Sequence, residues 1–279
     1  MEERNLSKIS NLSNLPNGKA RRGEKTLQHL LDTGLEAFAR YGPEGVSTRH
    51  LAKMAGVNSA AIQYYFGSKE GYYLAVVQHL LQTRAAPVLE LVADIAQRLE
   101  RSGRSQTETN LLLSELIQRL AKTVLLYPAA RYFASISSRE HLHPTKAYEL
   151  IYPVVERLHR LVSELVAAVL GIAPDSPEAI VRAHGLLGQV MLFRIGATTL
   201  CRRLQWDSIS EAQAEWIASV LAEMACRSLG LAPPAHQQAG KPLPDRHSAV
   251  LIEHPLEKER CSQPEGSSSH PCAGKDPML

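Results

Sequence analysis

The chain has 279 residues, 44% of them hydrophobic and 21% charged, which is typical of a soluble globular protein with one large or two small domains. Its net charge is only +3, so charge alone does not call for a nucleic-acid partner. Its four cysteines form no CxxC pair, its N-terminus lacks an apolar segment, and no apolar run reaches about 18 residues, so we expect a cytoplasmic protein without structural zinc, signal peptide, transmembrane helix or cofactor.

Residues 1–22 are predicted to form a flexible basic arm ahead of a nearly neutral body. Residues 1–26 hold six Lys and Arg against three Glu, an excess that equals the net charge of the whole chain. A first helix follows, which the Gly and Pro residues of 42–45 end. Its apolar stripe has helical spacing and consists of Leu27, Leu30, Leu31, Leu35 and Phe38.

Residues 47–66 are predicted to form a helix-turn-helix motif within a DNA-binding domain of residues 23–82. Ser47 can cap a short helix, Gly56 permits a tight turn, and Asn58 can cap a second short helix. Two short helices joined by a tight turn, after a longer helix, are typical of this motif.

The second short helix has the composition of a recognition helix. Ala60 and Ala61 are small enough to let its backbone approach the major groove. Gln63 can pair with N6 and N7 of adenine. The alternative for Gln63 is an ordinary solvated side chain.

The residues that follow are suited to phosphate contacts. Tyr64, Tyr65 and Lys69 can reach the DNA backbone without reading its sequence. Ser68 can cap the next helix, whose free N–H groups offer another phosphate site. The alternative for Tyr65 is to cover the core of the domain beside Phe66.

Residues 83–230 are predicted to form a second domain built from long helices. Breaks fall near Gly103, near Pro128 and at residues 141–145, 171–177 and 206–208. Helical segments of this kind suit a bundle rather than βαβ units. The expected fold class is therefore all-α, with a three-helix DNA-binding domain followed by a helical bundle.

Residues 231–279 are predicted to be a disordered tail. They contain eight of the 16 prolines and no Phe, Trp or Tyr, so they cannot bury enough apolar area to offset the entropy of ordering. A metal site at the "SHPC" segment near residue 272 is disfavoured because partner ligands are missing.

The segments "LLDTGLEAFARYGPEGVSTRHLAKMAGV" and "YYFGSKEGYYLAV" resemble the TetR family of bacterial regulators. "ISSREHLHPTKAYELIY" and "HGLLGQVMLFRIG" resemble the C-terminal domain of its CecR-like branch. The resemblance covers roughly residues 24–230. It implies an all-helical homodimer in which three N-terminal helices bind DNA and a larger bundle binds a small effector.

The resemblance also assigns roles to residues of the DNA-binding unit. Base contacts are expected from Arg49, Ser59, Ala60, Ala61 and Gln63. Phosphate contacts are expected by resemblance from Thr48, Tyr64, Tyr65 and Lys69. Independently of the resemblance, we expect further phosphate contacts from Ser68 at its helix start and from the basic residues Arg21, Arg22 and Lys25. The family usually has Tyr where this chain has Gln63, and often Gly where it has Ala60, so no operator preference carries over.

In the second domain, polar residues within apolar helices are the candidates for an effector pocket. These are Arg139, Glu140, His143, Tyr148, Tyr152, His184, Gln189 and Arg194. Each of them can instead be a solvated, bridging or interface residue. By resemblance, helices at about 176–205 and 208–229 form the homodimer interface.

The function expected from these features is that of a ligand-responsive transcriptional regulator, most often a repressor in this family, which binds a palindromic operator on double-stranded DNA. The alternative is a ligand-binding bundle with degenerate DNA binding. An enzyme is disfavoured, because Glu140, His141 and His143 do not share one helix face and no HExxH pair occurs.

Overall fold

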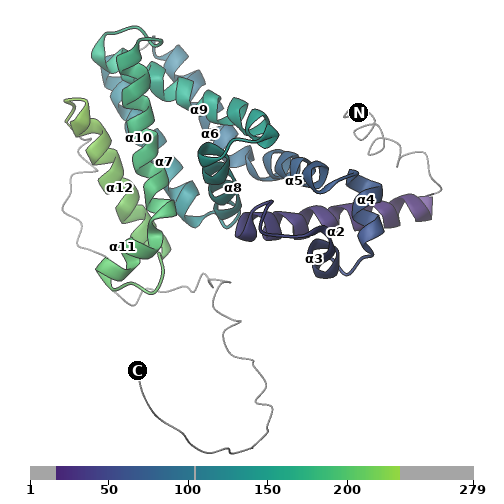
Figure 1. Cartoon of the computed structure of the whole chain (residues 1–279). Helices are drawn as coiled ribbons and strands as arrows, with labels where there is room; N and C mark the ends of the chain where they lie inside the picture. Colours follow the sequence, from purple (N-terminus) through teal and green to yellow (C-terminus); the bar gives the residue numbers. More distant parts are fainter. Residues whose placement is uncertain (1–16, 104, 233–279) are drawn as a thin grey trace, which may run out of the picture.

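The computed structural model describes residues 17–103 and 105–232, and side chains from residue 23 onward. Most of the expected arm (1–22) and of the expected tail (231–279) therefore lies outside the described residues. The described part is all-helical, as predicted, and its elements are drawn in Figure 1. They are α2 (Asn17–Tyr41), α3 (Thr48–Met54), α4 (Ser59–Phe66), α5 (Lys69–Arg84), α6 (Ala86–Arg101), α7 (Gln106–Leu126), α8 (Ala130–Leu142), α9 (Lys146–Leu170), α10 (Pro177–Ile195), α11 (Ala197–Leu204) and α12 (Glu211–Ser228).

The three helix starts predicted near the N-terminus are confirmed by side-chain caps. Ser47 Oγ accepts a hydrogen bond from the backbone N–H of His50 at the start of α3, at 3.2 Å. Asn58 Oδ1 accepts from Ala60 N at 3.0 Å, and Ser68 Oγ accepts from Gly71 N at 2.9 Å. Each cap satisfies a donor that the helix cannot pair internally, so these local contacts fix where α3, α4 and α5 begin.

The helices α2 to α5 enclose an aromatic core. The rings of Phe66 and Tyr72 stack with their centroids 4.3 Å apart, and Phe38 meets Tyr72 edge-on at 5.4 Å. Phe66 therefore plugs this core, as the sequence suggests. We call α2–α5 the head of the molecule.

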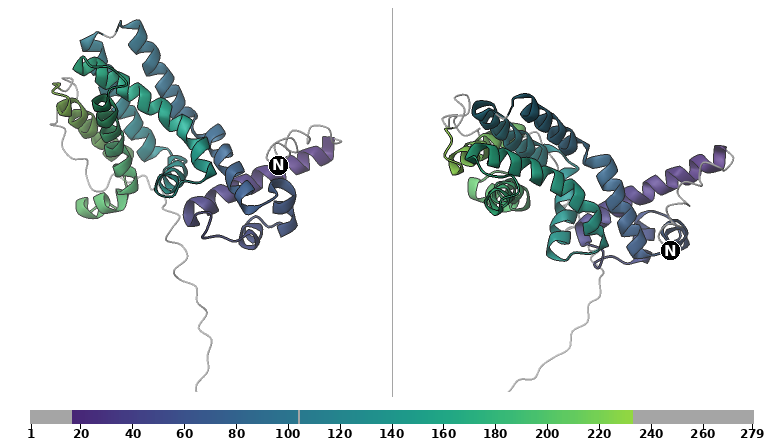
Figure 2. Two further views of the ribbon diagram at one scale, coloured as in Figure 1. Left: turned by 45° about the horizontal axis from the view of Figure 1, so that its top comes forward. Right: turned by 90° about the horizontal axis from the view of Figure 1, so that it is seen from above.

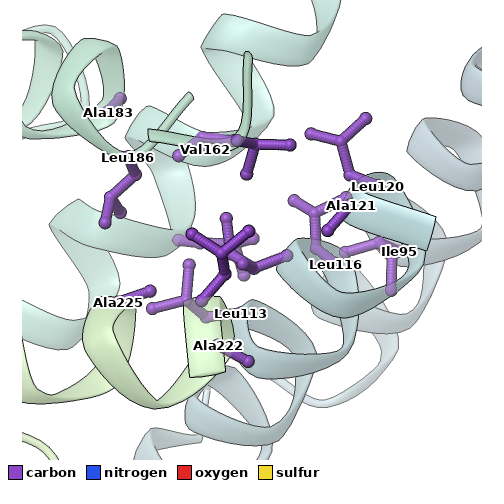
Figure 3. Packing of buried hydrophobic residues seen from close by; sticks show 14 of the residues in the cluster. Ile95, Leu113, Leu116, Leu120, Ala121, Val162, Ala183, Leu186, Ala222 and Ala225 are labelled. Carbon is purple, nitrogen blue, oxygen red and sulfur yellow. The ribbon is translucent and has the colours of Figure 1, made fainter. Parts of the chain in front are cut away.

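The second core lies among α6, α7, α9, α10 and α12, with α7 at its centre. Figure 3 shows Leu113, Leu116 and Leu120 of α7 facing side chains from several neighbouring helices. The interior is Leu- and Ala-rich, and the small residues Ala222 and Ala225 let α12 lie close against α7.

Two breaks in the helices differ from the prediction. The helix that begins at Lys69 ends at Arg84, and α6 starts at Ala86 with Pro87 in its first turn, where a missing N–H costs nothing. The single helix expected at about 176–205 is two helices, since α10 ends at Ile195 and Gly196 precedes α11. By contrast, Pro153 lies inside α9 without ending it.

The two cores do not divide at residue 82. The head core also contains Ile136 of α8 and Ala147 and Ile151 of α9, whereas the later part of α9 belongs to the second core. Figures 1 and 2 show α8 and the start of α9 lying against the head. We call residues 135–151 the corner, because they join the two cores.

Candidate nucleic-acid interface

One side of α4 is exposed and the other is buried. Ile62 and Phe66 are buried in the head core. The expected base-contacting residues Ser59, Ala60 and Gln63 are all exposed, and Ala61 is half-buried. The helix is held at both ends, by Asn58 at its start and by Gly67, whose φ of 74° ends it. The exposed side of α4 is thus a short, small-residue surface of the kind that a major groove admits.

The preceding helix adds one charged side chain to this surface. Arg49 is exposed in the first turn of α3, and Thr48 beside it is half-buried. A bond between the His29 ring and the backbone oxygen of Ala55, 3.2 Å long, ties the end of α3 to α2. This contact holds α3 against α2.

The two consecutive tyrosines have different environments. Tyr64 is 70% exposed, whereas Tyr65 is half-buried and its hydroxyl donates a 3.4 Å hydrogen bond to the backbone oxygen of Gly23. Burial raises the pKa of Tyr65, and the neighbouring Tyr64 raises it further. Tyr65 thus supports α2 while its edge stays accessible, and Tyr64 is free to extend outward.

The start of α5 carries the other expected phosphate contacts. Ser68 Oγ is engaged in the helix cap, so the backbone N–H groups of this turn are what remains for an anion. Lys69 Nζ lies 3.7 Å from Glu44 Oε2, an acidic neighbour in the loop after α2 that sequence reasoning missed. Lys25 is exposed on α2, whereas the side chains of Arg21 and Arg22 lie outside the described part.

The charges of residues 23–82, the expected DNA-binding domain, balance one another. Residues 23–82 contain five Lys and Arg and five Asp and Glu. Attraction to DNA therefore depends on where those charges lie and on the basic residues ahead of residue 23.

The eight candidate effector residues lie on two parts of the fold. Five belong to α8, α9 and the loop between them, and His184, Gln189 and Arg194 belong to α10. His143, Tyr152 and His184 are exposed. Neither of two hollows on the surface of α6 and α7, one beside Arg98 and one beside Lys122, is lined by any of the eight.

Two of these candidates face the head instead of an open pocket. Glu140 is buried and its carboxylate accepts hydrogen bonds from Tyr73 and Thr145. The guanidinium of Arg139 lies against Gly42, where a Cβ would meet Arg139 Cζ at 2.5 Å. Hydrogen bonds within the protein explain the polar character of Glu140, which a sequence pattern does not distinguish from a ligand site. Arg139 Nε is buried without a hydrogen-bond partner among the described residues.

Arg194 differs, because no counter-ion accompanies it among the described residues. It is half-buried at the end of α10. Burial lowers its pKa, and the positive charge of Arg131 lowers it further. Of the three α10 candidates, Arg194 is therefore the one whose positive charge is partly buried without an ion pair among the described residues.

One exposed side of α10 carries a mostly apolar strip, beside which His184 is also exposed. Val181, Gly185, Gly188, Leu192 and Ile195 follow one another at spacings of 4, 3, 4 and 3 residues, the repeat of a helix–helix seam. Val181 and Leu192 are 68% and 64% exposed. On α12, Met224 is exposed and Trp216 is half-buried. The spacing on α10 was visible in the sequence, but which side of the helix stays uncovered was not.

Within the described residues, no three His, Cys, Asp or Glu side chains are grouped as a metal site would require. No helix in that part of the chain combines the length and the apolar character needed to cross a bilayer.

Two family models match this architecture. Residues 30–76 match the model described as bacterial regulatory proteins, tetR family, and residues 109–231 match the C-terminal domain of the HTH-type transcriptional dual regulator CecR. CecR of Shigella flexneri is 33% identical over 200 residues, which cover 70% of this chain and 87% of that protein. The transcriptional regulator RutR of Escherichia coli (strain K12) is 34% identical over 67 residues, 24% of this chain and 32% of RutR.

A solved structure shares the fold as well. AibR, crystallised in complex with isovaleryl coenzyme A and operator DNA, has a TM-score of 0.53 and 17% identity to this chain. The match covers 75% of this chain and 99% of AibR. At this identity the likeness concerns the fold alone.

Proposed function

Because the chain belongs to the TetR family of transcriptional regulators and carries a CecR-type C-terminal domain, we propose that it binds a palindromic operator as a homodimer and that a small-molecule effector releases it. In this proposal the protein is a repressor, and α4 enters the major groove while α3 crosses the DNA backbone.

The observation that carries the proposal is the exposed side of α4. Ser59, Ala60 and Gln63 are presented outward while Ile62 and Phe66 anchor the helix from behind. Gln63 is the base reader, because its amide can both accept from and donate to adenine. Tyr64 and Lys69 flank it and hold phosphates, which set the register without reading sequence.

The apolar seam on α10 supports the homodimer. A contiguous apolar strip on a soluble protein marks a contact surface, and the 4–3 spacing fits a second helix. A copy of α10 related by a two-fold axis has the same strip, and glycines at 185 and 188 let the two backbones approach closely. Two heads related by that axis fit two half-sites about one DNA turn apart.

The effector acts by binding one spacing of the two heads more tightly than another. A ligand that binds both conformations equally does not change their populations. Coupling of about 1–3 kcal/mol is typical and would change operator occupancy strongly. Motion of α5, which Ser68 caps, carries the change to the DNA. The AibR structure holds a coenzyme A ester together with operator DNA, which supports a search among small organic molecules and does not identify one.

Gel shifts test the proposal with purified protein and the DNA upstream of its own gene. A specific complex that weakens with salt is the expected result. Absence of any specific complex would favour the alternative, a ligand-binding bundle with degenerate DNA binding. A reporter fused to the bound fragment separates repression, which we expect, from activation.

A further inference from the structure

A carboxylate is buried where the second domain meets the head. Glu140, near the end of α8, is 0% exposed. The hydroxyl of Tyr73 on α5 donates to its Oε1 at 2.8 Å. The backbone N–H and the Oγ1 of Thr145, which caps α9, both donate to its Oε2 at 2.9 Å. One side chain of the corner therefore joins α8, α9 and a helix of the head.

This arrangement is costly for a purely structural contact. Taking a carboxylate out of water costs free energy that only good hydrogen bonds offset, and an apolar side chain of similar volume fills such a site at lower cost. Among the described residues, no cation forms an ion pair with Glu140. The neutral donors of Tyr73 and Thr145 are its partners instead. The carboxylate adds directional hydrogen bonds that an apolar side chain cannot make.

The corner also contacts α2, the other long helix of the head. Ser135 Oγ donates a 2.5 Å hydrogen bond to the backbone oxygen of Ala39, and Arg139 packs on Gly42 directly after α2. At the surface, Lys146 Nζ lies 3.2 Å from Glu70 Oε1. The corner thus touches α2 and α5 at once, and the apolar residues Ala147 and Ile151 fill the space between.

Apolar packing and hydrogen bonding contribute differently here. The apolar contacts are non-directional and tolerate sliding, whereas the bonds to Glu140 require a defined distance and angle. Tyr73 lies one turn after Lys69, so a shift of α5 at Tyr73 also moves the start of the helix that we expect to hold phosphate.

We propose that Glu140 is a positioning residue for DNA binding: through Tyr73 it fixes the angle of α5 against the corner and thereby the spacing of the two heads. The inference rests on the proposed homodimeric operator binding and adds to it the residue that sets operator spacing. It also predicts that the corner and the head move as one body.

Two adjacent tyrosines provide a matched test. Tyr72 and Tyr73 are both buried in α5, but the Tyr72 hydroxyl donates to the backbone oxygen of Leu30 inside the head. Tyr73→Phe removes the bond to the corner, and Tyr72→Phe removes a bond of the same kind within the head. Thermal melting verifies that both variants fold.

The probe is the palindromic operator that wild-type protein selects from random-sequence DNA, remade with its spacer shortened or lengthened by one and two base pairs. We expect Tyr73→Phe to reduce the preference for the best spacer about fivefold or more, the low end of typical coupling between sites. Tyr72→Phe is expected to lower the melting temperature and to keep the wild-type preference.

Wild-type spacer preference in Tyr73→Phe would overturn the inference even if its overall affinity falls. If that variant does not fold, Glu140→Leu decides in the same way, because leucine fills the site and cannot accept the hydrogen bonds of Tyr73 and Thr145. Failure of the wild-type protein to select any operator is a different result and overturns the proposed function itself.

Discussion

Lys69 Nζ lies 3.7 Å from a carboxylate oxygen of Glu44, so the lysine expected to bind phosphate already has an acidic neighbour. The Glu44 side chain is 95% exposed and that of Lys69 is 33% exposed, and exposed pairs of this kind contribute about 0–1 kcal/mol. DNA phosphate therefore competes with a weak partner.

This pair gives opposite predictions for its two members. Lys69→Ala is expected to weaken binding to all sequences alike and to reduce the slope of log K against log salt by about 1. Glu44→Gln is expected to strengthen binding, because it frees Lys69 and removes a negative charge near phosphate. Binding titrations at several salt concentrations measure both, and altered base preference in Lys69→Ala would contradict a phosphate role.

Gln63→Ala tests direct readout by α4. The variant loses the amide that pairs with adenine, so discrimination at one base pair of each half-site is expected to fall by about 1–3 kcal/mol. Competition binding against operators changed one base pair at a time measures this. Tyr64→Phe is a suitable companion, since the loss of a phosphate contact leaves base preference intact. An unchanged base preference at every operator position in Gln63→Ala would show that Gln63 does not recognise a base.

The seam on α10 is tested by placing a charge in it. Leu192→Arg is expected to disrupt the dimer, because each subunit loses apolar burial of about 1.5–3 kcal/mol and gains an unpaired charge. Sedimentation equilibrium should show a monomer, and binding to the palindrome should fall with it. Leu142→Arg, at a residue 75% exposed at the end of α8, is the control. A dimeric Leu192→Arg protein would place the interface elsewhere.

Close packing of α2 on α5 predicts a stability effect within the head. A Cβ at Gly34 would meet Val76 Cγ2 at 2.7 Å and Tyr72 Cζ at 2.8 Å. Gly34→Ala is therefore expected to lower the free energy of unfolding by about 1–3 kcal/mol, despite the better helix propensity of alanine. Chemical denaturation measures this, with Glu36→Ala on the exposed side of α2 as the control. Equal stability of the two variants would mean that α5 moves aside freely.

The sequence predicted those features that depend on neighbours along the chain. The caps by Ser47, Asn58 and Ser68 bond to backbone groups two or three residues away, so residue type and position were enough to place the helices. The exposed side of α4 could be predicted from neighbouring residues too, because Ile62 and Phe66 are apolar and mark the buried side.

Features that depend on distant partners could not be predicted in this way. Glu140 was a candidate for an effector pocket because it is polar within an apolar stretch, but its partner Tyr73 is 67 residues earlier in the chain. Only the packing of α8 on the head brings them together. The break at Ala85 was missed although Pro87 marks it, because a proline in a first turn and one inside a helix look alike in sequence.

Selection of binding sites from random-sequence DNA tests most directly whether two heads of one homodimer read a palindrome. We expect enrichment of an inverted repeat whose half-sites lie about one helical turn apart, with a position in each half-site that depends on Gln63. Enrichment of a single, unrepeated site, or of no site at all, would contradict it.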